Sequence, residues 1–139
     1  MTAPREEIIA KVRAWATHAE DDLRVAQHTL TLSHGCPYHL VAYHAQQCAE
    51  KYLKAYLVLR GVDCAYMQNI ASLLSLCSRQ AAWGRDLKDA DELTPLAITA
   101  RYPGEDESVS EAEARRALDF AARVREVVRH ALDDEGVSL

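Results

Sequence analysis

The chain has 139 residues, of which 49% are hydrophobic and 27% are charged, and its formal net charge at pH 7 is −5. This length fits one domain with one modest hydrophobic core, and this composition argues against intrinsic disorder. The negative net charge excludes a whole-molecule attraction to nucleic acid, although it leaves room for a local basic groove. Segment 1–7 is too polar for a signal peptide, and no apolar run approaches the roughly 18 residues of a membrane span. We therefore expect a cytoplasmic protein with no membrane association, whose four cysteines are reduced thiols.

Apolar residues recur at alternating steps of three and four along much of the chain, which predicts long amphipathic helices. The first helix is expected to begin at Thr2–Pro4 and to end at 33–35, where a glycine can take the left-handed conformation of a C-cap. The second is expected over 37–60, because a proline fits its first turn and Gly61 supplies the next stop.

Shorter helical segments are predicted in the second half of the chain. One covers about 69–80, and 86–100 is expected to be helical with a kink or break at Pro95. Residues 101–106 form a loop by composition.

The last long helix has a clear start and end. Ser110 and Glu113 form a capping-box pattern, and the charged segment 133–136 ends the helix. There is no alternating β pattern and no internal repeat. The sequence therefore predicts one all-α domain over residues 1–139: an antiparallel up-and-down bundle of four to five helices, three long and one or two short.

The second predicted helix carries polar side chains on or beside its core-facing side. Gln47, Lys51 and Lys54 recur at helical spacing, and Glu50 stands in the favoured i,i+4 orientation toward Lys54. A solvated face with surface ion pairs is one interpretation, and a buried polar network that fixes helix packing or dimer register is another. Because Gln47 and Lys51 lie close to the apolar stripe, a lysine there needs an anionic partner or a path to solvent, and it could also hold a phosphate.

The histidines offer two weaker patterns. His44 and Cys48 are one helical turn apart, but no third or fourth ligand stands at a recognised spacing, so no metal site is predicted. A metal-independent ribonuclease can pair an arginine, which stabilises the charged phosphate, with a histidine that acts as acid or base. On the last helix Arg125 and His130 fit the spacing R-x4-H, and Arg123 and His130 fit R-x6-H, although such matches also arise by chance.

The run Tyr43–Leu57, followed by Gly61, closely resembles the central helix of HEPN domains, which are named for higher eukaryotes and prokaryotes and for proposed nucleotide binding. The resemblance covers about residues 10–132. Three more segments resemble the first helix, the short third helix and the Arg-Tyr-Pro turn of that family: Trp15 with 19–26, Ile70–Leu74, and Ala100–Pro103.

The resemblance implies a dimerising helical bundle that often accompanies a minimal nucleotidyltransferase (MNT) in a toxin–antitoxin pair. In characterised toxins of that kind the HEPN protein is a ribonuclease, with an R-x4-6-H motif at the dimer cleft. The partner inactivates it by nucleotidyl transfer to a nearby tyrosine. This chain departs from the pattern, because no tyrosine follows His130 and Gln68–Ile70 replaces the Thr-His-Asp of many relatives.

We therefore expect a HEPN-type homodimer that acts with an MNT-type partner and binds nucleotide or RNA phosphate. It is expected to need no cofactor beyond a nucleotide ligand such as ATP. Two alternatives are a metal-independent ribonuclease toxin that uses Arg125 and His130 as catalytic residues, and a non-catalytic dimeric scaffold. The predicted ligand-binding residues are polar groups of the second helix and of the Arg-Tyr-Pro turn: Gln47, Glu50, Lys51, Lys54, Arg101 and Tyr102.

Overall fold

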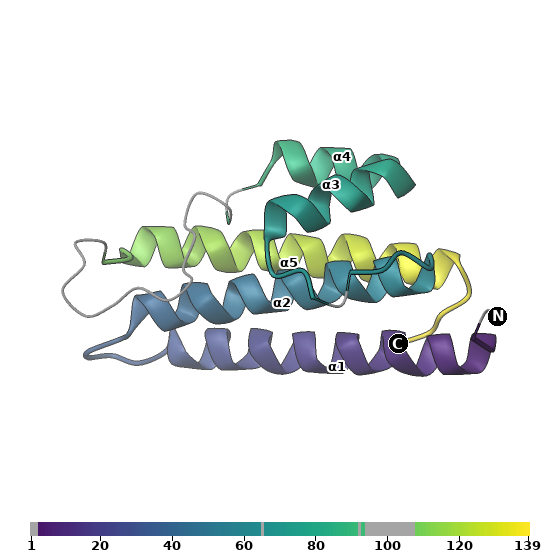
Figure 1. Ribbon diagram of the computed structural model, residues 1–139. Coiled ribbons are helices and arrows are strands. Elements are labelled where there is room, and N and C mark those ends of the chain that lie inside the picture. The colour runs from purple at the N-terminus through teal and green to yellow at the C-terminus, as the bar shows by residue number, and fades with distance from the viewer. Residues whose placement is uncertain (1–2, 65, 92, 94–107) are drawn as a thin grey trace.

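The computed structural model describes residues 3–64, 66–91, 93 and 108–139, and within them the regular structure is entirely helical. Three long helices lie side by side, and two short ones lie across one flank of them (Figure 1). The prediction of an all-α bundle is confirmed. The helices are α1 (Arg5–Thr29), α2 (Tyr38–Leu59), α3 (Ile70–Gln80), α4 (Ala82–Asp89) and α5 (Glu111–Asp134).

The directions of the long helices follow from the connections between them. A short turn joins α1 to α2, so these two helices run antiparallel (Figure 1). Helices α3 and α4 come before α5, which runs in the same direction as α2. Contacts between α2 and α5 agree with this parallel direction. Tyr38 donates to Glu111 at the N-terminal ends of the two helices, and Arg60 pairs with Glu135 at their C-terminal ends.

Local capping explains several helix boundaries. The predicted capping box begins α5, because Ser110 Oγ accepts from the backbone of Glu113 at 3.1 Å and Glu113 Oε1 accepts from the backbone of Ser110 at 3.1 Å. Asn69 likewise accepts from the backbone N–H of Ser72 at the start of α3. The first helix ends earlier than predicted, at Thr29, because the next turn tightens to i→i−3 backbone bonds.

Of the predicted helix over 86–100, residues 86–89 are helical, and residues 90, 91 and 93 are not. The structure begins α4 at Ala82, because Ala81 is extended and already separates α3 from a second helix. After Asp89 the helix stops, and the carboxylate of Asp91 accepts from the backbone of Leu93 in a turn. Residues 92 and 94–100, which include Pro95, lie outside the described residues.

Close backbone contact holds α4 against α3. A Cβ atom at Gly84 would stand 2.4 Å from the carbonyl carbon of Cys77, so only glycine allows this approach. The pair of short helices is therefore a compact unit, and it covers the side of α2 that α1 and α5 leave open.

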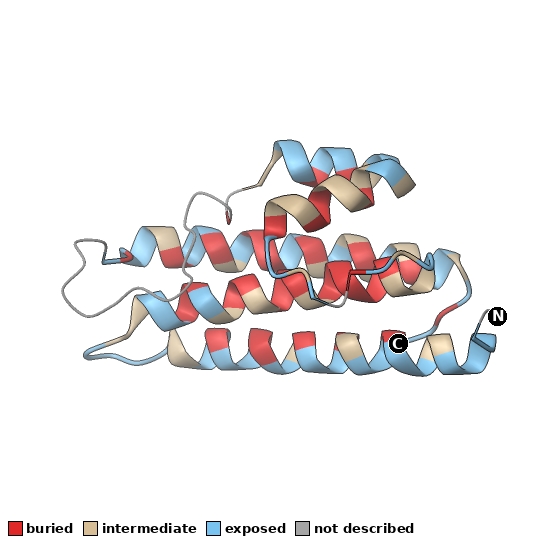
Figure 2. Cartoon of the chain, in the orientation of Figure 1, coloured by how far each residue is buried: buried red, intermediate tan, exposed pale blue. Residues whose placement is uncertain are grey.

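Helix α2 is the centre of the molecule, and its burial extends well beyond one stripe (Figure 2). It packs against α1, α5 and α3, so almost every side chain from Cys48 to Leu57 is buried. The start of α2 is less covered, and Leu40 there is 44% exposed. None of the described helices combines the length and the apolar character needed to span a membrane.

Candidate functional site

Asp22 of α1 is the partner of two polar side chains of α2. Its carboxylate accepts from Lys51 Nζ at 2.5 Å and lies 2.9 Å from His44 Nδ1. The sequence-based requirement that Lys51 needs an anionic partner is thus met inside the chain. His44 faces Asp22 rather than sharing a ligand with Cys48, and among the described residues no group of three or more metal-binding side chains could hold an ion.

Glu50 and Lys54 form a buried ion pair one helical turn apart on α2. The two side chains are 5% and 6% exposed, and Lys54 Nζ lies 3.1 Å from Glu50 Oε1. Gln47 also donates to Glu50, and Lys54 lies 5.1 Å from the ring centre of Trp15. A solvated surface pair was therefore the wrong interpretation for Glu50 and Lys54, and the buried-network interpretation describes them.

A third polar group joins α1, α2 and α5 around Glu20. Its carboxylate accepts hydrogen bonds from Tyr52 and Arg125, and Arg129 lies 3.9 Å away while donating to the Tyr52 hydroxyl at 3.3 Å. Burial by itself would raise the pKa of Glu20, but these hydrogen bonds and the two guanidinium charges hold that pKa below its ordinary value. Among the described residues, two arginines therefore share this one carboxylate, so two positive charges face one negative charge.

The cysteines make no ion pair with these groups, although Cys48 lies near two of the carboxylates. All four are free thiols, and burial raises the pKa of Cys48 to about 12, with the charges of Glu20 and Asp22 acting in the same direction. A thiol of this kind is protonated at neutral pH and therefore a poor nucleophile.

The two predicted catalytic residues, Arg125 and His130, have separate surroundings. Arg125 faces Glu20, whereas His130 is 77% exposed and lies 3.5 Å from Asp134. At about 100° per residue, five positions place the two side chains roughly 140° apart around α5. Arg123 and His130, by contrast, are seven positions and only about 20° apart, so they share a face.

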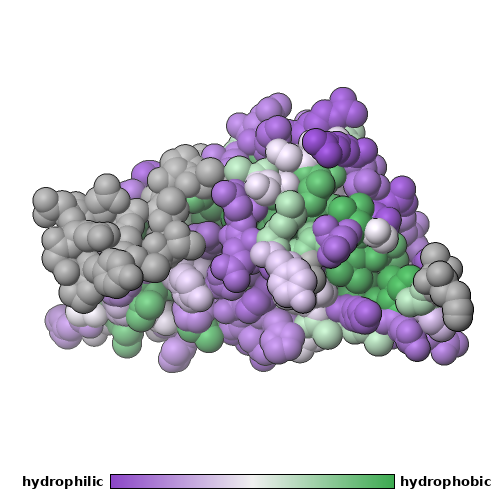
Figure 3. All heavy atoms as spheres, in the orientation of Figure 1, coloured by the Kyte–Doolittle hydropathy of each residue, from purple (hydrophilic) through white to green (hydrophobic). Residues whose placement is uncertain are grey.

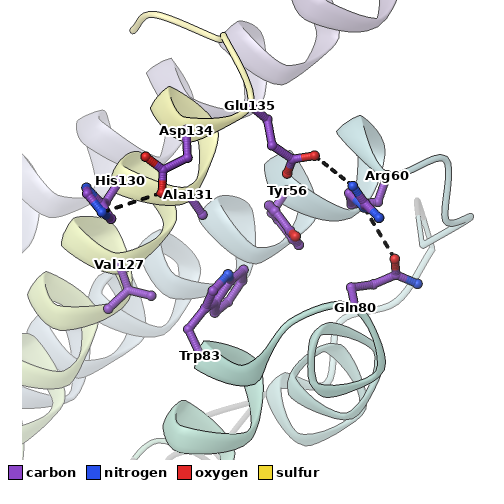
Figure 4. A pocket seen from close by; sticks show the side chains of 9 residues that line it. All are labelled: Tyr56, Arg60, Gln80, Trp83, Val127, His130, Ala131, Asp134 and Glu135. Atoms are coloured by element: carbon purple, nitrogen blue, oxygen red, sulfur yellow. Dashed lines mark hydrogen bonds and ion pairs between the residues drawn. The ribbon is translucent and has the colours of Figure 1, made fainter.

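His130 lies on the rim of a pocket of about 480 Å³ between α2, α4 and α5 (Figure 4). Tyr56 and Trp83 meet edge to face at its base, with ring centres 4.7 Å apart. The described residues that line it are Tyr56, Arg60, Gln80, Trp83, Val127, His130, Ala131, Asp134 and Glu135.

The outer surface is also divided by polarity. On the face shown in Figure 3, hydrophilic surface crosses the middle of the bundle, and apolar surface gathers toward the end where α3 lies over the C-terminal half of α2. Arg101 and Tyr102, the other two predicted ligand-binding residues, lie outside the described residues.

Several residues of these groups were not identified from the sequence. Asp22 could have been recognised, since it is an acidic residue three positions after Ala19 and four before Ala26, on the face of α1 that is buried. Glu20, Arg129 and Trp83 could not, because their partners lie on other helices.

Comparison with known proteins supports the resemblance seen in the sequence. The model of the HEPN domain matches residues 12–131. Among solved structures, an archaeal HEPN homologue is similar with a TM-score of 0.66 and 24% sequence identity, over 87% of this chain and 97% of that one. No curated protein matches the sequence significantly. At this identity the structural likeness shows the fold alone.

The buried pair yields a testable expectation for Lys54→Met. We expect this variant to lose about 3–5 kcal/mol of unfolding free energy near neutral pH, because the buried carboxylate of Glu50 loses its counter-charge. Burial already raises the pKa of Glu50. The folded variant therefore keeps a proton that the unfolded chain releases, and its stability falls as pH rises through the folded-state pKa. Urea unfolding at about pH 5.5 and about pH 8 should show the smaller loss at the lower pH.

Two further variants complete this measurement. Glu50→Gln combined with Lys54→Met should recover much of the lost stability, since neither charge remains. Arg115→Met removes the exposed i,i+4 pair with Glu111 and should change stability little at either pH. Equal losses for Lys54→Met and Arg115→Met would contradict the assignment of a buried pair.

Proposed function

Because the chain belongs to the HEPN domain family, we propose that it acts with a minimal nucleotidyltransferase, as a toxin–antitoxin-like pair, and binds the phosphate groups of a nucleotide or RNA. The observation that carries the phosphate proposal is the excess of positive charge at Glu20. Arg125 and Arg129 share that one carboxylate, and their side chains are 36% and 32% exposed. A guanidinium presents its donors in a fork that fits phosphate oxygens.

The lysines of α2 contribute less to this proposal than Arg125 and Arg129 do. Lys54 is buried against Glu50, and Lys51 is bound by Asp22, so each ammonium group already has an intrachain carboxylate. Their contacts are explained by packing between α1 and α2. Phosphate binding is therefore proposed at Arg125 and Arg129, and a ligand role for Lys51 and Lys54 stays a prediction.

The phosphate proposal is tested by two variants, one that removes a positive charge and one that removes the negative charge. Arg129→Ala should weaken ATP binding about tenfold, the size expected for losing one charge-assisted hydrogen bond. Glu20→Gln should strengthen binding several-fold, because it removes the carboxylate that competes with phosphate while the amide still accepts from Tyr52. Isothermal titration of the purified variants with ATP and with a short RNA gives both affinities.

Arg115→Ala is the matched control, since it removes an exposed arginine of the same helix, paired one turn away with Glu111. It should leave both affinities unchanged. If Arg129→Ala and Arg115→Ala behave alike, or if Glu20→Gln weakens binding, the phosphate site is not at Arg125 and Arg129.

The proposed assembly is a homodimer that binds the nucleotidyltransferase. Large apolar side chains exposed around the α1–α2 connection support self-association, among them Leu32 at 50%, Leu40 at 44% and Tyr43 at 38%. Light scattering should give twice the 15.5 kDa chain mass, and Leu40→Glu should give the monomer mass.

Co-expression with a minimal nucleotidyltransferase encoded beside the gene should yield one co-eluting complex. Separate elution would contradict the partnership, and a monomeric wild type would contradict the dimer.

A metal-independent ribonuclease is the second candidate function, and the shared face of Arg123 and His130 favours it. Arg123 lines a hollow of about 280 Å³ between α5 and Ala90 at the end of α4, and His130 lines the pocket of about 480 Å³ further along α5. An arginine and a histidine on one flank can stabilise phosphate charge and transfer a proton, respectively. Helical geometry thus favours Arg123 over Arg125 as the partner of His130.

The ribonuclease candidate predicts RNA cleavage in the presence of EDTA and growth arrest on expression. His130→Ala and Arg123→Ala should each lower the cleavage rate by about 100-fold or more, the range for losing an acid–base group or an oxyanion contact. Arg115→Ala should cleave as the wild type does. Wild-type protein that is harmless when expressed alone and leaves RNA intact would exclude this function.

A further inference from the structure

The pocket at the C-terminal end of α5 has the construction of a small-molecule site and lies away from the proposed phosphate site. Tyr56 and Trp83 form an aromatic base, and Val127 and Ala131 of α5 form an apolar wall (Figure 4). Its volume of about 480 Å³ is within the range of ligand pockets. A ligand here would therefore bury an aromatic or other apolar group against two rings.

The charges on the rim of the pocket disfavour an anion. Arg60 is the only arginine or lysine among the described lining residues, and it is already bound by Glu135 at 2.7 Å and by Gln80 at 3.4 Å. Asp134 lies on the same rim with its side chain 65% exposed, and its contact with His130 is long, at 3.5 Å. A phosphate or carboxylate entering the pocket would meet Asp134 and would have to displace Glu135 from Arg60.

The rim lies at the C-terminal end of α5, which makes the electrostatic potential there more negative. The C-terminal end of a helix carries partial negative charge from its unpaired carbonyl groups. Here the last turn contains no basic residue, and Asp133, Asp134 and Glu135 follow one another at the helix end. Arg5 donates to the backbone carbonyl of Glu135 at 2.9 Å and offsets part of this charge. The carboxylate of Asp134 lies 3.5 Å from His130, and a cation bound at the rim would interact favourably with it.

From the aromatic base and the acidic rim together, we propose that this pocket binds a small organic cation, an amine carried on an aromatic or apolar group. The apolar group lies against Trp83 and Val127, and the ammonium group lies at the rim beside Asp134. The site is separate from the phosphate site proposed at Arg125 and Arg129, because these residues lie on the opposite flank of α5, whereas it shares His130 with the ribonuclease candidate.

Three probes of one skeleton test the charge preference: phenethylamine, 2-phenylethanol and 3-phenylpropanoate. The readout is the indole N–H resonance of Trp83 in ¹H–¹⁵N spectra of the full chain, assigned with Trp15→Phe, which leaves a single indole. Phenethylamine should shift this resonance in a saturable way. The alcohol should bind more weakly, and the carboxylate should bind about tenfold more weakly than the amine or not at all.

Two neighbouring carboxylates give the matched pair of variants. Asp134→Asn should weaken phenethylamine binding about fivefold, whereas Asp133→Asn, which changes an exposed carboxylate that does not line the pocket, should change it less than twofold. Thermal melts establish that both variants are folded. The proposal is overturned if the carboxylate binds as tightly as the amine, if the amine leaves the Trp83 resonance unmoved, or if the two variants weaken binding equally.

Discussion

The burial of α2 on almost all sides is the constraint on which the other features of this protein depend. A helix enclosed by α1, α3 and α5 cannot turn its charged residues to solvent, so each buried charge needs a partner within the chain. Lys51 forms an ion pair with Asp22 on α1, and Lys54 forms one with Glu50, one turn earlier on α2 itself. The contact between Lys51 and Asp22 limits how α2 is rotated against α1, since a different rotation would leave the Asp22 carboxylate without this counter-charge.

The same constraint separates charges that stabilise the fold from charges available to a ligand. Around Asp22 and Glu50, each lysine is balanced by one carboxylate, so little electrostatic potential remains for an anion. Around Glu20, two guanidinium groups meet one carboxylate at the edge of the bundle, where solvent still reaches them. The number of carboxylates relative to the number of cations in a group, rather than the presence of a lysine or arginine, therefore distinguishes a packing contact from a site for an anion.

Helix α5 carries different chemistry on its two flanks because its side chains advance by about 100° per residue. One flank presents Arg125 and Arg129 to α1 and α2, and the other presents Arg123 and His130 toward α4. The short helices α3 and α4 convert the second flank into a lined pocket, since Trp83 of α4 reaches Tyr56 of α2 across it. Two independent sites on one helix are thus compatible with a chain of this size.

The sequence by itself determined the all-α class, the family, and most helix ends, because apolar periodicity and capping act between residues a few positions apart. It also identified the charged residues of α2 as unusual, though not whether they were buried. Only the tertiary structure decided that Lys51 meets Asp22, 29 residues away, and that Arg125 meets Glu20, 105 residues away. It likewise placed Arg125 and His130 on different flanks and brought Trp83 to the pocket. Burial and charge pairing depend on which helices become neighbours, and that is a property of the packed bundle rather than of any single segment.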